Sequence, residues 1–282
     1  MEISKIAIVG AGQMGAGIAQ VSAQAGLEVV LIDMDPGLVE RGIAGIKAQL
    51  DKAVGKGKLS AESATAAISK IRPGKSTEDA AGAQFAVEAV TENENVKRKV
   101  FAGLAASMGN DAILASNTSS IPITRIAAMV PNPERVIGMH FMNPVPVMQL
   151  VEIIRAIQTS DATYAVTDAL ARKLGKTTVL SKDMPGFIIN RILIPMINEA
   201  CFALQEGLGT AGDIDTAMKL GTNQPMGPLA LADFIGLDTC LYIAEVLHKG
   251  LGEDKYRPAP ILRQHVEAGW MGKKTKRGFF QY

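Results

Sequence analysis

The pattern Gly10-Ala-Gly12-Gln-Met-Gly15 constrains the fold of this chain more than any other feature. An apolar, β-branched run, Lys5–Val9, precedes it, and a helix-forming stretch, Met14–Ala25, follows it. In such a pattern the first glycine permits a tight turn, the second lets a ligand approach the backbone, and the third lets helix and strand pack closely. The pattern therefore predicts the strand–turn–helix unit that opens a Rossmann-type sheet.

The next strand carries a second signal for a dinucleotide. Asp33 ends the run Glu28–Asp33, where an acid hydrogen-bonds the adenosine ribose and repels a 2′-phosphate. No Arg or Lys follows before Arg41, so we expect NAD and not NADP. The alternative is a glycine-rich turn without a ligand. The residues expected to surround the pyrophosphate at the helix N-terminus are Gly10, Gly12, Gln13, Met14 and Gly15.

Strand-like and helix-like stretches alternate up to about residue 182, which is typical of a mostly parallel, doubly wound sheet. Residues 37–70 interrupt the alternation and predict two helices joined near Gly55–Lys58, with Ser60 as an N-cap. We therefore predict an α/β, NAD-binding Rossmann-like domain over residues 1–183 with an inserted helical hairpin at about 37–70. Its further expected strands are Phe85–Val90, Ala112–Ser116, Val136–Met139, Leu150–Ile154 and Thr177–Leu180.

The pattern changes after residue 183, where no strand signal is left. Apolar residues recur at helical spacing in 185–206, 211–220, 228–234, 237–247 and 260–268. Pro195 lies inside the first of these helices and predicts a kink. We predict an all-helical C-terminal domain over 184–282 that shapes the substrate site. Its apolar helices carry more surface than one small domain buries, so we expect a homodimer through this domain.

Composition excludes several classes of protein. The net charge of +1 provides no strong field for a nucleic acid or a membrane surface. No apolar stretch of 18 residues is free of polar breaks, so we expect no membrane span. Two cysteines, Cys201 and Cys240, without CxxC spacing argue against a disulfide framework and a zinc site. A strand that begins near Ile3 leaves no room for a leader, and we expect a cytoplasmic protein.

Residues 140–152 form a second constellation, His140-Phe-Met-Asn143-Pro144 followed by Glu152. His140 ends the apolar run Arg135–Met139, and Glu152 lies inside an apolar strand, where a carboxylate is costly without a partner. A histidine held by a carboxylate is a common general base near neutral pH. In a chain with a dinucleotide site, the pair predicts proton transfer coupled to hydride transfer.

Polar side chains also follow the strand Ala112–Ser116. The segment 117–120 should lie at the carboxyl edge of the sheet, where ligands bind in open α/β folds. His140 would reach the same edge, and Asn190 lies on the first helix of the second domain. A substrate between the domains could meet Ser119, His140 and Asn190. Ser119 should also cap the helix that follows it, and Asn190 could instead satisfy backbone groups at the junction.

Taken together, these motifs resemble the 3-hydroxyacyl-CoA dehydrogenase family, and within it the short, single-activity members that act on C4 substrates. The resemblance runs from residue 3 to the end of the chain. It rests on Ser116–Ser120, on His140–Pro144 with Glu152, and on Asp183–Arg191. It implies an NAD-dependent interconversion of (S)-3-hydroxyacyl-CoA and 3-oxoacyl-CoA.

The resemblance implies a role for each matching residue. His140 takes the 3-hydroxyl proton as hydride leaves C3, and Glu152 orients the imidazole and favours its charged form. Ser119 and Asn190 donate hydrogen bonds to the substrate oxygen. Asn143 lies near both substrate and His140.

Further implied residues line the NAD site around the ribose and nicotinamide. They are Glu92, Lys97, Asn117, Asn143 and Lys274. Only the resemblance singles out Glu92 and Lys97, which could otherwise be exposed residues at the start of a helix.

Lysines are the expected ligands of the acyl carrier, because coenzyme A carries three phosphates. Residues 47–75 are locally basic, and the resemblance points to Lys56 and Lys52, four apart and on one helix face if the helix continues past Gly55. The tail 273–277 is also basic. Its Lys276 and Arg277 stand where relatives carry a glycine and an acid or glutamine, which leaves the role of the tail open.

Two other interpretations compete with this one. The 3-hydroxyisobutyrate and phosphogluconate type of dehydrogenase has the same architecture but takes its base from a lysine on the long interdomain helix. Residues 185–206 contain no lysine. A λ-crystallin-like structural protein would keep the fold and the NAD site without catalysis, yet every expected catalytic residue is present here.

Overall fold

A computed structural model describes residues 1–282. The chain forms two compact units, Met1–Met184 and Pro185–Tyr282. Each unit has its own hydrophobic core. No helix is both long and apolar enough to cross a membrane.

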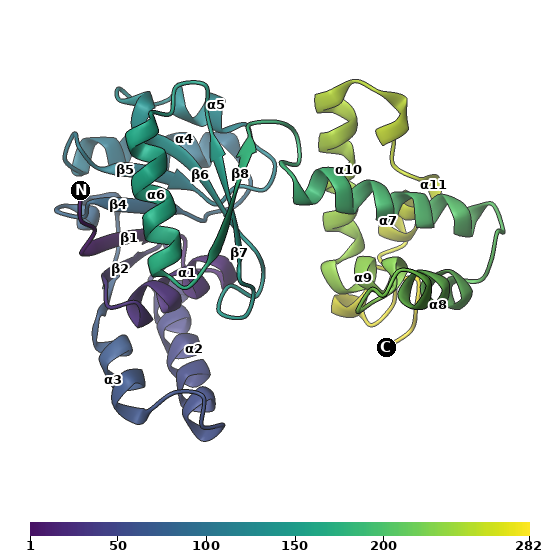
Figure 1. The fold of residues 1–282 in the computed structure, drawn as a ribbon, viewed down its shortest axis with the longest axis horizontal. Helices are drawn as coiled ribbons and strands as arrows, with labels where there is room; N and C mark the ends of the chain where they lie inside the picture. The colour runs from purple at the N-terminus through teal and green to yellow at the C-terminus, as the bar shows by residue number, and fades with distance from the viewer. The chain divides into compact units, whose positions relative to one another are not determined.

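The first unit is built on one eight-stranded sheet with the order β3-β2-β1-β4-β5-β6-β7-β8 (Figure 1). Strand order reverses between β1 and β4, as in a doubly wound fold. The predicted Rossmann-type architecture is therefore confirmed. The strands are β1 Lys5–Val9, β2 Glu28–Ile32, β3 Ile71–Gly74, β4 Phe85–Glu88, β5 Ile113–Ser116, β6 Val136–Phe141, β7 Leu150–Arg155 and β8 Thr177–Lys182.

One strand, β3, is not predicted by the sequence pattern. It is four residues long, contains Pro73, and pairs in parallel with β2 at the edge of the sheet. Proline lacks the N–H of an internal strand and is tolerated at such an edge. A short segment with a proline carries too little periodicity to be recognised as a strand.

The sheet is parallel except at one pair, β6 and β7. Only residues 142–149 connect these two strands, and a parallel crossover needs a dozen residues or more. The antiparallel register places His140 directly opposite Glu152. This local reversal positions the two side chains that matter most for the site.

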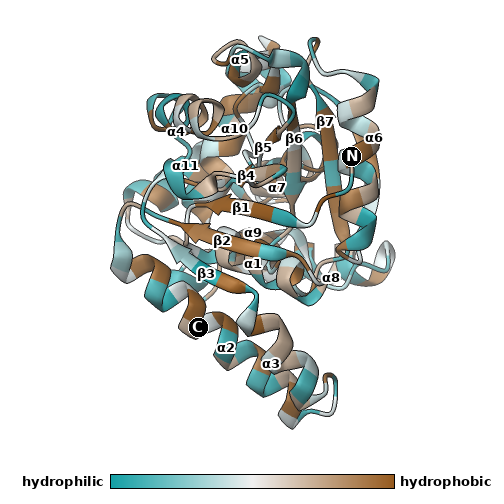
Figure 2. Cartoon of the chain, turned by 90° about the vertical axis from the view of Figure 1, so that its left-hand side faces the viewer, coloured by the Kyte–Doolittle hydropathy of each residue, from teal (hydrophilic) through white to brown (hydrophobic).

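Six helices belong to the first unit: α1 Gln13–Gln24, α2 Pro36–Gly55, α3 Ala61–Ser69, α4 Glu94–Ser107, α5 Ile123–Ala127 and α6 Asp161–Lys173. The predicted hairpin corresponds to α2 and α3, which extend beyond the β3 edge of the sheet (Figure 2). Ser60 caps α3 as expected, because its hydroxyl accepts the Ser63 N–H at 3.1 Å. Asp35 caps α2 through the Gly37 N–H, and Pro36 occupies the first turn.

The central strands are buried on both faces, which explains their almost unbroken apolar sequences. Ile6, Ile8 and Leu31 have no exposed surface, and Phe85 on β4 is equally buried. The brown strands at the centre of Figure 2 show this continuous apolar interior. The carboxyl ends of β1, β4, β5 and β6 therefore emerge from a rigid base.

The second unit is all-helical, as predicted: α7 Ile189–Gln205, α8 Ala211–Gly221, α9 Pro228–Ile235, α10 Leu237–Leu251 and α11 Pro260–Glu267. Its core includes Ile197, Cys201 and Leu237. The first helix begins at Ile189 and not at Pro185, because Gly186 and Phe187 have φ angles of 78° and 51°. Such left-handed backbone cannot belong to a right-handed helix.

Candidate functional site

The glycine turn after β1 has the shape of a phosphate cradle. Gly10 has φ 105°, and its N–H donates to the Ile32 carbonyl at 2.7 Å. A Cβ on Gly15 would lie 1.7 Å from the Gly10 carbonyl oxygen, so a side chain there would separate strand from helix. A Cβ on Gly12 would instead meet nothing within 4 Å. The open position is the one through which a ligand would approach the backbone.

The N-terminus of α1 is available to an anion. Gly12 precedes the helix without a side-chain cap, and the first turn contains no acid. The unpaired N–H groups and the helix dipole both favour a phosphate there. Two of the residues expected around the pyrophosphate have other contacts. The Gln13 side-chain amide donates to Asn143, and Met14 packs against the hydrophobic core of the first unit.

Asp33 stands where the adenosine ribose of a dinucleotide is held. One carboxylate oxygen accepts the Ala11 N–H at 2.9 Å, and the other accepts the Asp35 N–H at 3.1 Å. The cation that follows in the sequence, Arg41, lies 3.5 Å from the Asp35 carboxylate. A fixed carboxylate beside the glycine turn suits a ribose diol and opposes a 2′-phosphate. The residues of this edge therefore fit NAD.

The expected contact between His140 and Glu152 is present. The two residues are cross-strand partners on β6 and β7, and the His140 Nδ1 atom lies 2.7 Å from Glu152 Oε2. Glu152 is fully buried and His140 is 8% exposed. A carboxylate at Nδ1 requires a proton on that nitrogen, so Nε2 becomes the basic atom of the neutral ring. This is the arrangement of an oriented general base.

Two asparagines form hydrogen bonds between β6 or the loop after it and the segments that follow β5 and β1. The Asn117 side-chain oxygen accepts the N–H of Phe141 at 2.9 Å. The Asn143 side-chain oxygen accepts from Gln13 Nε2 at 3.0 Å. The segments that follow β1, β5 and β6 thus meet at one edge of the sheet.

A buried ionic cluster lies beside this edge. The Lys97 ammonium on α4 is 2.6 Å from Glu88 Oε1 and 3.2 Å from Glu92 Oε2, and its side chain is 1% exposed. The interpretation of Lys97 and Glu92 as exposed helix-start residues is therefore wrong. Burial pushes the pKa of Glu92 upward, but the Lys97 charge and the hydrogen bonds from Thr118 and Ser119 outweigh it and lower the pKa.

Glu92 also holds the segment after β5. Its Oε1 accepts the Thr118 hydroxyl and the Ser119 N–H, both at 2.7 Å, and the Ser119 hydroxyl at 3.2 Å. The expectation that Ser119 caps the next helix is wrong. That helix, α5, begins at Ile123, and the Asp183 carboxylate accepts its first N–H groups.

The sequence pattern does not single out Glu88, and it includes Ser116 only as the first residue of the segment Ser116–Ser120, without a role. Glu88 is fully buried, and its Oε2 accepts the Ser116 hydroxyl at 2.6 Å. Its Oε1 also accepts the Val90 N–H at 2.8 Å. The available signal was an acid that closes the apolar strand Phe85–Glu88, the same signal that pointed to Glu152.

Two predicted site residues belong to the second unit. Asn190 lies in the first turn of α7 and is 8% exposed. Lys274 forms an ion pair with Asp238, at the start of α10. That Asn190 meets the same substrate as Ser119 and His140 remains a prediction.

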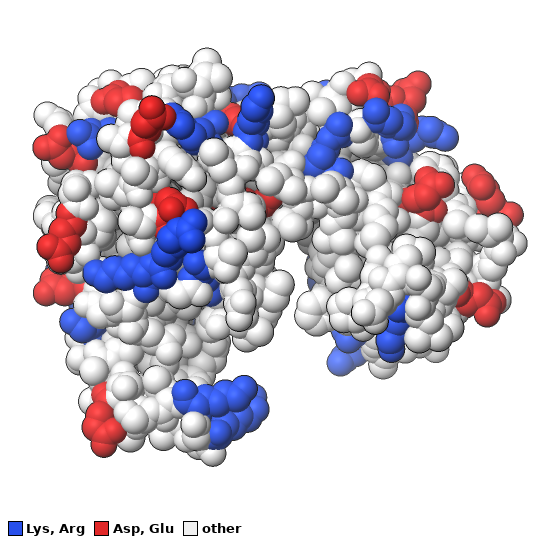
Figure 3. Space-filling model, viewed as in Figure 1, with Lys and Arg blue, Asp and Glu red and all other residues white.

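The lysines expected to bind coenzyme A are exposed on the hairpin. Although α2 ends at Gly55, the Lys56 N–H still bonds to the Lys52 carbonyl at 3.2 Å, so both lysines stay on one face. Figure 3 shows cations gathered at the free end of the hairpin. In the tail, by contrast, the Arg277 guanidinium stacks on Trp270 at 3.7 Å.

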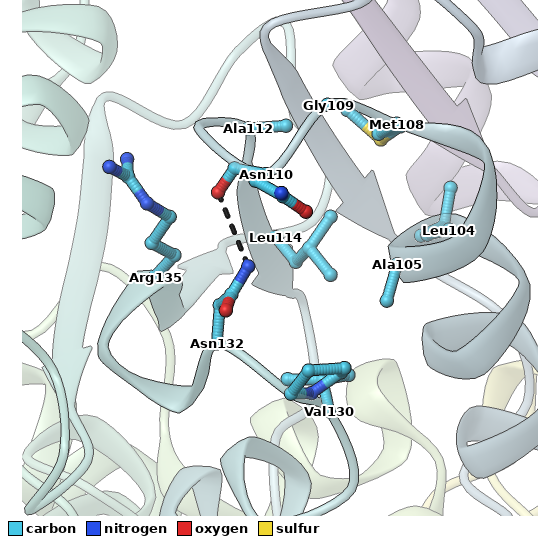
Figure 4. Close-up of a pocket in the computed structure, with 11 residues that line it drawn as sticks. Leu104, Ala105, Met108, Gly109, Asn110, Ala112, Leu114, Val130, Asn132 and Arg135 are labelled. Atoms are coloured by element: carbon cyan, nitrogen blue, oxygen red, sulfur yellow. Dashed lines mark hydrogen bonds between the residues drawn. The ribbon is translucent and has the colours of Figure 1, made fainter.

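A small hollow elsewhere in the first unit is not part of this site (Figure 4). It lies between the end of α4 and the turn before β6, and its walls include Leu104, Met108 and Leu114. Asn132 bridges its rim to the Asn110 carbonyl at 3.3 Å. The hollow faces the amino ends of the strands, opposite the edge that carries His140.

Comparison with known families covers both units. Residues 5–184 match the NAD binding domain of 3-hydroxyacyl-CoA dehydrogenase, and residues 186–282 match the C-terminal domain of the same family.

Individual relatives agree over the full length. A 3-hydroxybutyryl-CoA dehydrogenase from Bradyrhizobium diazoefficiens is 53% identical over 280 residues, which are 99% of this chain and 96% of the relative. A probable 3-hydroxybutyryl-CoA dehydrogenase from Bacillus subtilis is 53% identical, with 100% and 98% covered. The crystal structure of (S)-3-hydroxybutyryl-CoA dehydrogenase from Ralstonia eutropha superposes with a TM-score of 0.97 at 48% identity, with 100% and 99% covered.

Proposed function

This chain belongs to the 3-hydroxyacyl-CoA dehydrogenase family of NAD-dependent oxidoreductases, and we propose that it interconverts (S)-3-hydroxybutyryl-CoA and acetoacetyl-CoA. The observation that carries the proposal is the buried contact of 2.7 Å between His140 and Glu152 in an NAD-binding domain. The C4 substrate is inferred from the names of relatives that are 53% identical.

The His140–Glu152 pair supplies the proton chemistry. The glycine turn at Gly12 and the Asp33 carboxylate would hold NAD, which would supply the acceptor, or as NADH the donor, of a hydride at C3 of the substrate. In oxidation, His140 Nε2 takes the proton of the 3-hydroxyl group, and in reduction the imidazolium returns a proton to the same oxygen. Glu152 keeps the ring oriented and stabilises the imidazolium, because its carboxylate is fully buried and poorly screened.

Hydrogen-bond donors on both units complete the proposed site. Ser119 and Asn190 donate to the substrate oxygen, whose negative charge grows when the carbonyl is reduced. Glu92 supports Ser119 by accepting its N–H at 2.7 Å. The Ser119 hydroxyl carries a single proton, so its bond to Glu92 at 3.2 Å gives way to the bond with the substrate oxygen. Asn143, held by Gln13, borders the substrate and His140.

The remaining proposed features concern binding and assembly. Lys56 and Lys52 contact the phosphates of coenzyme A from the hairpin, and Lys274 approaches the cofactor from the tail. The chain acts in the cytoplasm as a homodimer through its helical unit. Sedimentation at micromolar concentration tests the assembly, and a monomer would overturn it.

The relatives favour this function over its rivals. A lysine-based dehydrogenase needs a lysine on α7, and that helix contains none. A structural, λ-crystallin-like protein has no need for a buried histidine–carboxylate pair.

The test follows absorbance at 340 nm with acetoacetyl-CoA, using NADH and NADPH in separate runs, and repeats the NADH run with C8 and C12 3-oxoacyl-CoA. We expect NADH oxidation with kcat/KM highest for the C4 substrate. A preference for the C12 substrate would overturn the C4 assignment, and a preference for NADPH would overturn the cofactor assignment. No turnover with any substrate, in protein that binds NADH, would overturn the enzymatic function.

A further inference from the structure

The cluster beneath the candidate site does not balance its charges. Glu88 and Glu92 each carry a carboxylate, and both contact the single ammonium of Lys97 at 2.6 and 3.2 Å. The group therefore has a formal charge of −1. The side chains of Glu88, Glu92 and Lys97 are 0%, 26% and 1% exposed, so water screens the excess charge only weakly.

Neither Glu88 nor Glu92 forms a second ion pair within 4.0 Å that would offset this excess. Glu94 is the next acid along the chain, and its carboxylate already pairs with Arg125 at 2.9 Å and with Arg98 at 4.0 Å, all on the surface. The other partners of the cluster are neutral donors: the hydroxyls of Ser116, Thr118, Ser119 and Ser120 and the N–H groups of Val90 and Ser119. The hydrogen bonds from Thr118 and Ser119 favour the ionised form of Glu92, consistent with its lowered pKa.

The position of the cluster in the sheet places its negative charge near the nicotinamide half of a bound dinucleotide. A dinucleotide in a doubly wound sheet lies across the point where strand order reverses, here between β1 and β4. Asp33 at the end of β2 marks the adenosine half. The nicotinamide half therefore belongs to the side of β4 and β5, and the cluster lies at the carboxyl ends of these two strands, with Glu88 and Ser116 as their last residues.

We propose that the Glu88–Lys97–Glu92 cluster tunes the cofactor preference of this site toward the oxidised form. The nicotinamide ring is cationic in NAD⁺ and neutral in NADH, so a fixed negative charge stabilises the first and leaves the second nearly unchanged. Glu88 acts from beneath the site, through charge and through its hold on Lys97 and Ser116, and it is a positioning residue. The inference rests on NAD binding, a property of the family, and not on the identity of the acyl substrate.

The experiment measures the dissociation constants of NAD⁺ and NADH for the full chain by calorimetry, without acyl substrate. The decisive quantity is the ratio Kd(NAD⁺)/Kd(NADH), because any change that weakens both forms equally cancels in it. The interaction of unit charges separated by the order of 10 Å, at an effective dielectric constant of about 20 to 40, corresponds to roughly four- to fifteen-fold in binding. Glu88→Gln should therefore raise the ratio at least about threefold.

Matched variants separate charge from structure. Glu88→Asp keeps the charge and should keep the ratio within about twofold of the wild-type value. Glu94→Gln removes an acid from the same region but from a solvated surface pair, and it should also leave the ratio unchanged. Glu92→Gln removes the same unit of charge at a partly exposed position and should also raise the ratio. It replaces Glu88→Gln as the test if that variant does not fold.

The proposal is overturned if folded Glu88→Gln or Glu92→Gln binds both cofactor forms with the wild-type ratio. It is also overturned if Glu94→Gln raises the ratio as much as these variants do. Because the assay contains no acyl-CoA, its outcome is independent of the proposed substrate.

Discussion

Replacing Glu152 by glutamine tests the proposed catalytic pair with the least change in shape. The side chain is fully buried between strands, and its only changed group is the oxygen pair that faces His140 Nδ1 at 2.7 Å. A glutamine amide can direct its NH2 group at Nδ1. The imidazole would then carry its proton on Nε2, the nitrogen that has to accept the substrate proton.

The expected loss of rate follows from this geometry. A buried hydrogen bond to a charged group contributes about 1.5–3 kcal/mol, and about 1.4 kcal/mol corresponds to a factor of ten. Loss of imidazolium stabilisation alone then lowers kcat by roughly 10- to 150-fold. Because the wrong tautomer adds to this, we expect Glu152→Gln to lower kcat by about 10²–10³-fold.

The assay is steady-state reduction of acetoacetyl-CoA at 340 nm, with NADH affinity measured separately by fluorescence. NADH affinity should stay within about twofold, because Glu152 acts through His140, which is proposed to move the substrate proton and not to bind the cofactor. Asp161→Asn is the matched control, because its carboxylate pairs with Arg155 at the end of the same strand but is 94% exposed. A folded Glu152→Gln enzyme within fivefold of the wild-type kcat would refute the role assigned to Glu152.

Three further predictions address the cofactor, the carrier and stability. Asp33→Asn should reduce the preference for NADH over NADPH at least about tenfold in kcat/KM, and an unchanged preference would remove Asp33 from selectivity. Lys56→Ala should raise the KM for acetoacetyl-CoA about three- to tenfold and spare kcat, because it removes uniform binding; Lys58→Ala on the same turn should change neither. The ionised form of Glu92 stabilises the fold above its unfolded pKa of about 4.3, and this contribution is lost as pH falls through the lowered folded pKa. The unfolding midpoints of the wild type and Glu92→Gln should thus differ at pH 7 and converge in acid, and parallel curves would contradict the assigned ionisation.

The architecture of the first unit could be predicted because its signals are local. The glycine turn, the acid at the end of the second strand and the buried apolar runs each report on their own neighbourhood. The edge strand Ile71–Gly74 could not be predicted because it has four residues and a proline. Its strand conformation comes from pairing with β2, which is a tertiary effect.

The contact between His140 and Glu152 could be predicted for a different reason. A carboxylate inside an apolar strand demands a partner, and few candidates existed in the chain. The same reasoning applies to Glu88, an acid at the end of the apolar strand Phe85–Glu88, and predicts that it has a buried partner without identifying it. The sequence alone does not reveal which of two acids, Glu88 or Glu92, is buried.

Other details depended on packing that no local pattern encodes. Ser119 looks like an N-cap, yet its donors turn to Glu92, and Asp183 serves α5 from 60 residues away. The second unit begins its first helix at Ile189, because the backbone of Gly186 and Phe187 is left-handed.

The most direct test of the central claim is the kcat of His140→Ala with acetoacetyl-CoA and NADH, measured beside its affinity for NADH. General base catalysis contributes about 10²–10⁴-fold, and loss of positioning adds to it. We predict a fall in kcat of at least about 10³-fold, with the Kd for NADH within about threefold of the wild-type value. A folded variant that binds NADH and keeps near-wild-type kcat would contradict the assignment of His140 as the proton-transfer residue.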